Sequence, residues 1–305
     1  MRCLESHANK LRKYIVPLIS CSIDFYVRVF VRVYTSPLNV KRSASKHSYY
    51  YSCRGCETFH LQPVGTKIEQ GNQKKYLPGT GPSIPQTCAE CGRNHYMGGP
   101  IWSDPIHDQA FVAKLLENIK SSTEEDFATR ERLVGMVTLI SEELPDAPFY
   151  YDLPSLSKKI RCITPAILPM RSVIMNSNHR VSATHCNMHA LKTDAPPEVM
   201  WDIMRCWVKK NPVKMKNFEN GAPGKAILEK PPKFEADFTE RPDADAESRK
   251  IKLVRFPELP ANWGPLAKAK RYRFFAFNSV STFPPSQLHF VPRMSQWKGT
   301  AGRPR

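Results

Sequence analysis

Residues 25–33 have the sequence Phe-Tyr-Val-Arg-Val-Phe-Val-Arg-Val, and this strict alternation predicts a β-strand. The face expected to lie in the core consists of Phe25, Val27, Val29, Val31 and Val33. The opposite face mixes aromatic rings with guanidinium groups, which can stack on bases and hold phosphates: Tyr26, Arg28, Phe30 and Arg32. From the strand alone, an edge strand with its arginines in solvent fits slightly better than a nucleic-acid surface.

The residues before this strand place it at the end of a larger sheet. Little sequence precedes it, and one strand cannot bury an apolar face by itself, so we expect the other strands of the sheet to be missing from the chain. The apolar run over residues 14–23 is too short for a membrane span of about 20 residues. It is interrupted by Asp24 and Arg28. We expect this run to lie inside the domain, and no membrane among the partners.

The composition favours a polyanion as partner. The 305 residues include 45 Lys and Arg against 28 Asp and Glu, a net charge of +17, and 41% of them are hydrophobic, which is typical of a globular chain. Each phosphate that such cations neutralise releases condensed counterions, which favours binding to nucleic acid. The alternative is a basic charge that is spread evenly over the surface and has no specific partner.

Two Cys-x-x-Cys knuckles form the strongest local motif. Cys53-Arg-Gly-Cys56 and Cys88-Ala-Glu-Cys91 are separated by 31 residues. Two such knuckles complete a tetrahedron of thiolates around zinc without an open ligand position, so we expect a structural site. Gly55 and Gly92 are expected at positive φ in the tight turns. A redox dithiol and two unrelated pairs are the alternatives, and nine cysteines without a signal peptide favour a reducing compartment.

Helical periodicity begins after the knuckles. Apolar stripes and capping signals predict helices at 111–119, 133–144, 153–160, from 165 or 169 to 176, and 200–207. Residues 180–192 have an extended pattern, and together with the preceding helices they give the order expected of a winged helix. The region after Asn211 lacks periodicity and is expected to be a linker, and the last 41 residues form a basic, aromatic tail.

Several segments resemble one enzyme family. Ile15-Val-Pro-Leu-Ile-Ser20 followed by Asp24-Phe-Tyr-Val-Arg-Val-Phe-Val-Arg32 is similar to the end of the methyltransferase domain in tRNA guanine-26 dimethyltransferases. Further segments resemble the family in the same order: Gly98-Gly-Pro-Ile-Trp102, Asp104-Pro-Ile-His-Asp108, Glu142-Glu-Leu-Pro-Asp146, Lys192-Thr-Asp-Ala-Pro196, Trp201-Asp-Ile-Met-Arg-Cys-Trp207 and Asn262-Trp-Gly-Pro265. The resemblance therefore covers most of the chain.

This resemblance implies an enzyme that transfers two methyl groups from S-adenosylmethionine to the exocyclic amine of one guanine in tRNA. In the family, a glycine-rich loop holds the donor and an Asp-Pro-aromatic-Gly motif supports the transfer. Neither occurs in this sequence, because Ile106 and His107 follow Asp104-Pro105. We therefore expect no catalytic or donor-binding residues in the chain, and no activity of the chain alone. The alternative to an enzyme is a non-catalytic tRNA-binding fragment or isoform.

The predicted fold class is α/β plus α+β, in four parts. Residues 1–47 hold the terminal strands of a class I, Rossmann-like methyltransferase sheet, 48–100 a zinc-ribbon-like insertion, 101–212 a helical, winged-helix-like tRNA-binding domain, and 213–305 a linker and disordered tail. The expected cofactors are a structural zinc ion and, for the full-length family enzyme, S-adenosylmethionine.

The resemblance also bears on the RNA contacts and on the location. It favours tRNA as the partner of the face formed by Tyr26, Arg28, Phe30 and Arg32. Further contacts are expected on the surface of the winged-helix-like part, at Arg171, Arg180, Lys192 and Arg205. A nuclear location is expected, with the mitochondrion or the cytoplasm as alternatives.

Overall fold

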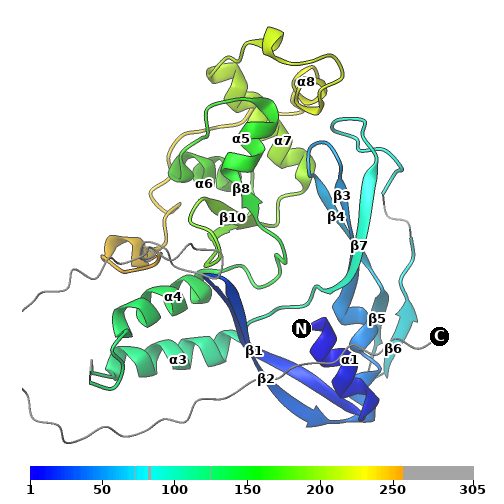
Figure 1. Ribbon diagram of the computed structural model, residues 1–305, viewed down its shortest axis with the longest axis vertical. Helices are drawn as coiled ribbons and strands as arrows, with labels where there is room; N and C mark the ends of the chain where they lie inside the picture. Colours follow the sequence, from blue (N-terminus) through cyan, green and yellow to red (C-terminus); the bar gives the residue numbers. More distant parts are fainter. Residues whose placement is uncertain (72, 82–83, 124, 257–305) are drawn as a thin grey trace, which may run out of the picture. The chain divides into compact units, whose positions relative to one another are not determined.

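The computed structural model describes residues 1–71, 73–81, 84–123 and 125–256 (Figure 1). These residues all fall within one compact unit, Met1–Pro265. The aromatic tail that the sequence predicts after Pro265 lies outside the described residues. Among the described helices, none is long and apolar enough to cross a membrane.

The described chain has mixed α and β content. Its strands are β1 (Lys13–Ile23), β2 (Tyr26–Thr35), β3 (His47–Cys53), β4 (Phe59–Pro63), β5 (Gly65–Gln70), β6 (Gln73–Pro78), β7 (His95–Trp102), β8 (Tyr151–Asp152), β9 (Val181–Ala183) and β10 (Ala190–Thr193). Its α-helices are α1 (Arg2–Lys10), α2 (Pro37–Val40), α3 (Gln109–Ser121), α4 (Arg130–Glu142), α5 (Leu153–Ile160), α6 (Ile167–Asn176), α7 (Pro197–Lys210) and α8 (Pro223–Leu228). Short 3-10 helices are η1 (Ser43–Lys46), η2 (Met215–Asn217) and η3 (Glu247–Lys250).

The strand predicted at 25–33 is β2, and it pairs with β1 as an antiparallel hairpin. The register shifts between Pro17 and Ile19, at the point where proline has no N–H to donate to the ladder. The hairpin packs on α3 and α4 through β1 (Figure 1). The buried residues of this first core are Ile19, Cys21, Val112, Ile119, Val134, Val137 and Ile140.

The burial predicted for the valine face of β2 is wrong at three of its five residues, while Val29 and Val31 are half-buried. Val27 and Val33 are 69% and 52% exposed, and Phe25 is 56% exposed. The reason is that the helices cover β1, while no described element forms a layer over β2. The strand was therefore predicted correctly, but its surroundings were not.

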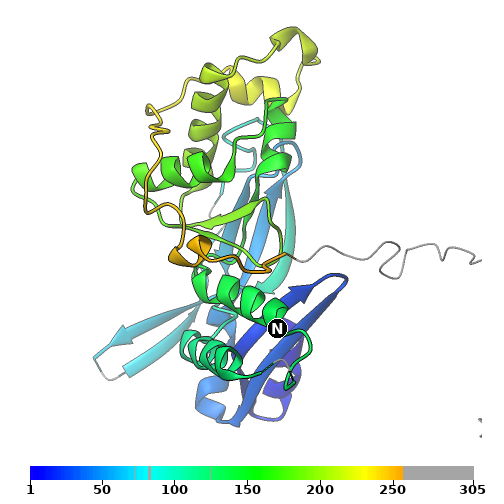
Figure 2. The ribbon, with the colours of Figure 1, turned by 90° about the vertical axis from the view of Figure 1, so that its left-hand side faces the viewer.

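A second core joins the knuckles to the helices. β3 lies between β4 and β7 in a three-stranded sheet, and the knuckle cysteines at its end pack with α5, α6, α7 and α8. A separate sheet has the order β8–β10–β9, and the β5–β6 hairpin extends away from both (Figure 2). Because the predicted parts 48–100 and 101–212 share this core, they are not separately packed.

Several predicted elements are confirmed, and the linker prediction is wrong within the described residues. The five helices predicted after the knuckles correspond to α3, α4, α5, α6 and α7, and the extended arm contains β9 and β10. The region after Asn211, however, packs on the second core, because Ile227 of α8 is fully buried and Phe218 and Ala236 are nearly so. These scattered apolar residues have no period by which the sequence could have revealed them.

Candidate metal centre and nucleic-acid surface

The structure brings the four knuckle cysteines together at one buried point. Cys53 Sγ lies 3.3 Å from Cys91 Sγ, and Cys56 Sγ lies 3.6 Å from Cys88 Sγ. All four ligand atoms lie within 4.8 Å of one another. Tetrahedral zinc with bonds of about 2.3 Å requires sulfur separations close to these values. The four thiols can therefore hold a zinc ion without a large rearrangement.

Backbone hydrogen bonds shape the two knuckles in different ways. In the second knuckle, Gly92 has a φ of +73° and its N–H donates to Cys88 O at 2.8 Å, so the prediction for this glycine is confirmed. In the first knuckle, the positive φ of 65° falls on Glu57 and not on Gly55. Gly55 is needed for a close approach instead, because a Cβ there would lie 2.9 Å from Pro223 Cγ.

Helix α7 supports the knuckles with two polar side chains. Trp201 Nε1 donates to Thr58 Oγ1 at 2.7 Å, and this hydroxyl lies 2.9 Å from Cys56 Sγ. Arg205 pairs with Asp202 at 2.5 Å and with Glu90, which lies inside the second knuckle. The knuckles and α7 are therefore held together by hydrogen bonds as well as by apolar packing.

The surface position predicted for three of the basic residues is wrong. Arg171, Lys192 and Arg205 are only 4%, 6% and 6% exposed. Arg171 pairs with Asp245, Lys192 Nζ lies 2.8 Å from Glu143, and Arg205 has the partners given above. Buried cations with carboxylate partners have no charge to offer a phosphate. Three of the acidic partners, Asp245, Glu143 and Glu90, are remote in sequence, so helical periodicity could not reveal them. Asp202 lies three residues before Arg205 on the same helix.

The other predicted contacts lie on the surface. Arg180 is exposed, with Asp194 at 2.7 Å from its Nε and Asp146 at its Nη2, so much of its charge is already neutralised. On β2, Arg28 and Arg32 are exposed, and Tyr26 and Phe30 are 38% and 50% exposed. The Arg28 guanidinium lies 5.3 Å from the centre of the Tyr26 ring. The strand therefore presents cations and rings together.

A second buried cluster, formed by His107, Glu143, His185 and Lys192, was not predicted from the sequence. The Glu143 carboxylate lies 2.6 Å from His185 Nδ1, 2.8 Å from Lys192 Nζ and 3.7 Å from His107 Nε2. We call these four residues the histidine latch. A signal existed, because His107, Glu143 and Lys192 all lie in segments that carry the family resemblance.

The hydrogen bonds of the latch favour neutral rings and not a metal ion. Two histidines and a carboxylate this close could hold a metal. A metal-bound histidine, however, normally donates its other ring N–H to an acceptor. Here the other nitrogens accept, from Ser20 N–H on His107 Nδ1 at 3.4 Å and from Ser22 N–H on His185 Nε2 at 3.0 Å. The ring protons therefore face Glu143, and the latch caps the outer edge of β1.

The electrostatics of the latch agree with an ionised Glu143. Burial alone would raise its pKa, but the nearby His107, the hydrogen bond from His185 and the charge of Lys192 hold the pKa well below its usual range. Burial also opposes charge on His185, while its contacts with Cys186 and Glu143 raise its pKa to about 9. This raised pKa conflicts with the geometry, because the Ser22 N–H needs a lone pair on Nε2. The hydrogen bond favours the neutral ring, with Lys192 as the cation.

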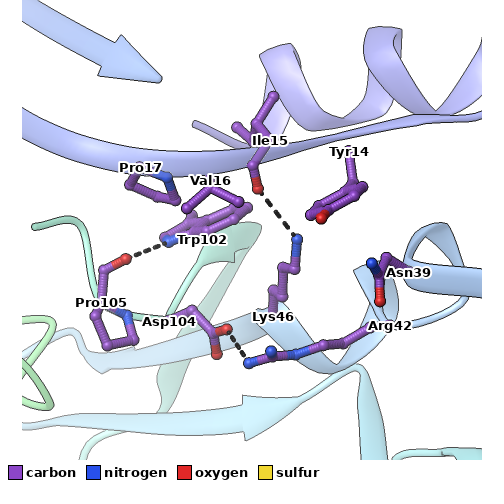
Figure 3. Close-up of a pocket in the computed structure, with 10 residues that line it drawn as sticks. All are labelled: Tyr14, Ile15, Val16, Pro17, Asn39, Arg42, Lys46, Trp102, Asp104 and Pro105. Carbon is purple, nitrogen blue, oxygen red and sulfur yellow. Dashed lines mark hydrogen bonds and ion pairs between the residues drawn. The ribbon is translucent and has the colours of Figure 1, made fainter. Parts of the chain in front are cut away.

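A pocket of about 350 Å³ lies beside β1, and Figure 3 shows its lining. At its floor, Lys46 Nζ lies 2.6 Å from Glu5 Oε1 and 5.1 Å from the centre of the Trp102 ring. At its mouth, Arg42 pairs with Asp104 at 3.1 Å (Figure 3). Because both of these cations have carboxylate partners, neither is left to attract an anionic ligand.

Comparison with a solved structure first defines the class of fold. The chain superposes on a structure described as a complex of Trm1 from Pyrococcus horikoshii with S-adenosyl-L-methionine, with a TM-score of 0.51 and 22% identity. The match covers 65% of this chain and 46% of that chain. The matched part of the chain therefore shares its fold, of mixed α and β content, with part of that protein.

Sequence comparison then gives the family. The model of the N2,N2-dimethylguanosine tRNA methyltransferases matches residues 1–205, and the chain belongs to this family. It is 46% identical over 269 residues to tRNA (guanine(26)-N(2))-dimethyltransferase 1 of Arabidopsis thaliana, and 44% identical over 273 residues to the Homo sapiens enzyme tRNA (guanine(26)-N(2))-dimethyltransferase. Each alignment covers 88% of this chain but only 45% and 41% of those relatives.

Proposed function

We propose that the protein is an S-adenosylmethionine-dependent tRNA (guanine-26 N2)-dimethyltransferase, and that the residues of this chain bind the tRNA. The observation that carries this proposal is the 46% identity to a relative of that name over 88% of the chain. The Pyrococcus horikoshii protein was solved as a complex with S-adenosyl-L-methionine, which supports the same donor here. The net charge of +17 supports a polyanionic substrate.

A structural zinc ion belongs to the same proposal. The four buried thiols leave no open position for a substrate, so zinc would stabilise the fold and take no part in the chemistry. The knuckles lie at the ends of antiparallel strands in the order β4–β3–β7, which supports a zinc-ribbon arrangement.

The element order from α4 to β10 supports a winged-helix arrangement. Helix α4 is followed by β8, α5, α6, β9 and β10, and the sheet order is β8–β10–β9. In helix-turn-helix proteins a recognition helix usually reads nucleic acid, and α6 would occupy that place here. However, α6 has no exposed residue, and Asn176 and Ser172 on it hydrogen-bond to the segment 237–241. We infer that this unit is a scaffold and that tRNA lies against other surfaces.

The β2 face is the surface that we propose for tRNA. Reversal of both cations by Arg28→Glu plus Arg32→Glu should lower tRNA affinity several-fold or more and weaken its salt dependence, because phosphate contacts and their counterion release are lost. Fluorescence anisotropy with a tRNA transcript at several salt concentrations measures both. A matched control is Lys214→Glu plus Lys216→Glu, since these exposed lysines lie elsewhere. Equal losses in the two variants would show that only diffuse charge acts.

A non-catalytic tRNA-binding fragment or isoform is the second candidate. It is favoured by one observation, the lack of a glycine-rich donor loop and of an Asp-Pro-aromatic-Gly motif in the sequence. Calorimetric titration of the chain with S-adenosylmethionine, and a methyl-transfer assay on tRNA, separate the candidates. Donor binding or methylation would contradict the second.

The nuclear location, with the mitochondrion and the cytoplasm as alternatives, stays a prediction that imaging of a fluorescent fusion can test.

A further inference from the structure

A surface hollow of about 600 Å³ lies over the two knuckles. We call it the knuckle hollow, and its lining consists of Arg54, Gly55, Gly92, Arg93, Asn94, Tyr96 and Pro223. Most of these residues are exposed. Arg54 lies inside the first knuckle, and Arg93 lies two residues after the second. The hollow is lined by cations, an amide and an aromatic ring.

The pairing of the knuckles fixes both arginines on one side. Arg54 N–H donates to Asn94 O at 3.0 Å, which ties the first knuckle to the segment that follows the second. The Arg93 guanidinium donates to Gly221 O at 2.7 Å and is thereby held against the loop before α8. A Cβ at Gly55 would lie 3.0 Å from Arg93 Cγ, so glycine leaves room for this arrangement.

The charges of the knuckle hollow differ from those of the pocket beside β1. There, Arg42 and Lys46 each have a carboxylate partner. Among the described residues, neither Arg54 nor Arg93 forms an ion pair: Arg54 lies 4.7 Å from the centre of the Tyr96 ring, and Arg93 has only a carbonyl. Guanidinium groups without carboxylate partners are suited to hold a phosphate.

Tyr96 adds a surface for a base. Its side chain is 57% exposed although Arg54 covers part of the ring. A nucleobase can stack on an exposed tyrosine, and base–aromatic stacking is tolerant of sequence. Asn94 supplies a donor and an acceptor at the rim. Cation, ring and amide thus match the phosphate and the base of one nucleotide.

We propose that the knuckle hollow binds a phosphodiester and its neighbouring base in tRNA. The proposal rests on the function proposed above and adds a second contact surface to the β2 face. The competing explanation is electrostatic: four thiolates and one zinc ion carry a formal charge of about −2, which the two arginines would offset. In that case their loss would weaken zinc binding and leave tRNA binding unchanged.

The test uses the whole chain, zinc-loaded, and a tRNA transcript. Arg54→Gln plus Arg93→Gln should lower the tRNA affinity about tenfold near 0.1 M salt and reduce the slope of log K against log salt by about 0.7–0.9, as expected for one phosphate. Lys214→Gln plus Lys216→Gln removes the same charge elsewhere and should change both values much less. Zinc content and melting temperature are measured for each variant.

Tyr96 gives an independent readout. Tyr96→Ala should lower the tRNA affinity several-fold while the slope of log K against log salt stays the same. Tyr96→Phe keeps the ring and should bind tRNA with the wild-type affinity. Unchanged affinity in the arginine double variant, or a loss equal to that of the lysine control, would overturn the proposal. Lower zinc content with normal tRNA affinity would show that the arginines only offset the metal centre. A wild-type chain that does not bind tRNA would instead contradict the proposed function.

Discussion

The two strands of the β1–β2 hairpin have similar lengths but opposite surroundings. The outer edge of β1 is occupied along its length: Ile15 N–H donates to Glu5 at 2.7 Å, Leu18 O accepts from Asp108 N–H at 2.9 Å, and the latch histidines accept from two further N–H groups. On β2, by contrast, exposed apolar side chains occur on both faces of the strand, at Val27, Phe30, Val33 and Tyr34.

This difference separates two kinds of apolar surface in the molecule. Around the knuckles and under β1, apolar residues are buried in two cores. On β2, apolar residues occur on both faces without a covering layer among the described residues, which is typical of strands inside a sheet covered on both faces. We therefore expect substitutions around the knuckles and under β1 to lower the free energy of unfolding, and substitutions on β2 to change it little.

The largest effect is expected at the knuckles. Cys88→Ser, or removal of the metal by a chelator, should unfold the second core, because zinc binding to such sites contributes an apparent 10–16 kcal/mol, roughly, at neutral pH. Metal analysis of the wild type should find about one zinc per chain. Cys3→Ser is a suitable control, since Cys3 is exposed and outside the cluster. A Cys88→Ser chain that keeps its zinc and its melting temperature would exclude the site.

Arg205 should show the next largest effect, on stability and not on RNA binding. Arg205→Ala leaves Glu90 and Asp202 buried without their cation, and breaking a buried pair in this way costs about 3–5 kcal/mol. Denaturant unfolding measures the loss. The control is Arg180→Ala, whose exposed ion pairs contribute about 0–1 kcal/mol. If the Arg205→Ala protein were as stable as the wild type and its tRNA affinity depended less on salt, Arg205 would be an RNA contact after all.

The latch should come third. His185→Leu removes the acceptor for Ser22 N–H and a donor to Glu143, and each buried polar group left without a partner costs about 1–3 kcal/mol. Hydrogen exchange should show faster exchange of the β1 amides, and unfolding should show the loss of stability. His189→Leu, at an exposed position of the same loop, is the control. No change in the Ser22 amide would mean that β1 is not held by the latch.

The sequence predicted the helices, strands and cysteine motif well, but it predicted the contacts between remote residues poorly. Alternation at 25–33 identified β2, and the apolar stripes identified α3 and α4, because these signals depend only on neighbouring residues. Likewise, the fixed spacing within the knuckles predicted that four cysteines would meet.

The errors have one physical cause, which is that burial depends on contacts between remote segments. Arg171 is covered because the segment around Asp245 folds back over α6, a contact between residues 74 positions apart. The latch likewise unites His107 with Glu143 and Lys192 from separate motifs. The periodicity of one segment does not predict its contacts with remote segments. Cations that were expected on an exposed helix face are therefore buried.

The smallest effect is expected on the valine face of β2. Val27→Thr plus Val33→Thr keeps the β-branched shape on a strand where these side chains are 69% and 52% exposed, so stability should change by no more than about 0.5 kcal/mol per site. The matched substitution Val134→Thr, at a 7% exposed position of α4, should cost about 1–3 kcal/mol because it buries a hydroxyl. Unfolding curves of the two variants compare the regions directly. If the β2 variant lost as much stability as the α4 variant, the valine face would be buried in solution. Another part of the protein would then cover β2 in solution, and β1 and β2 would no longer differ in their surroundings.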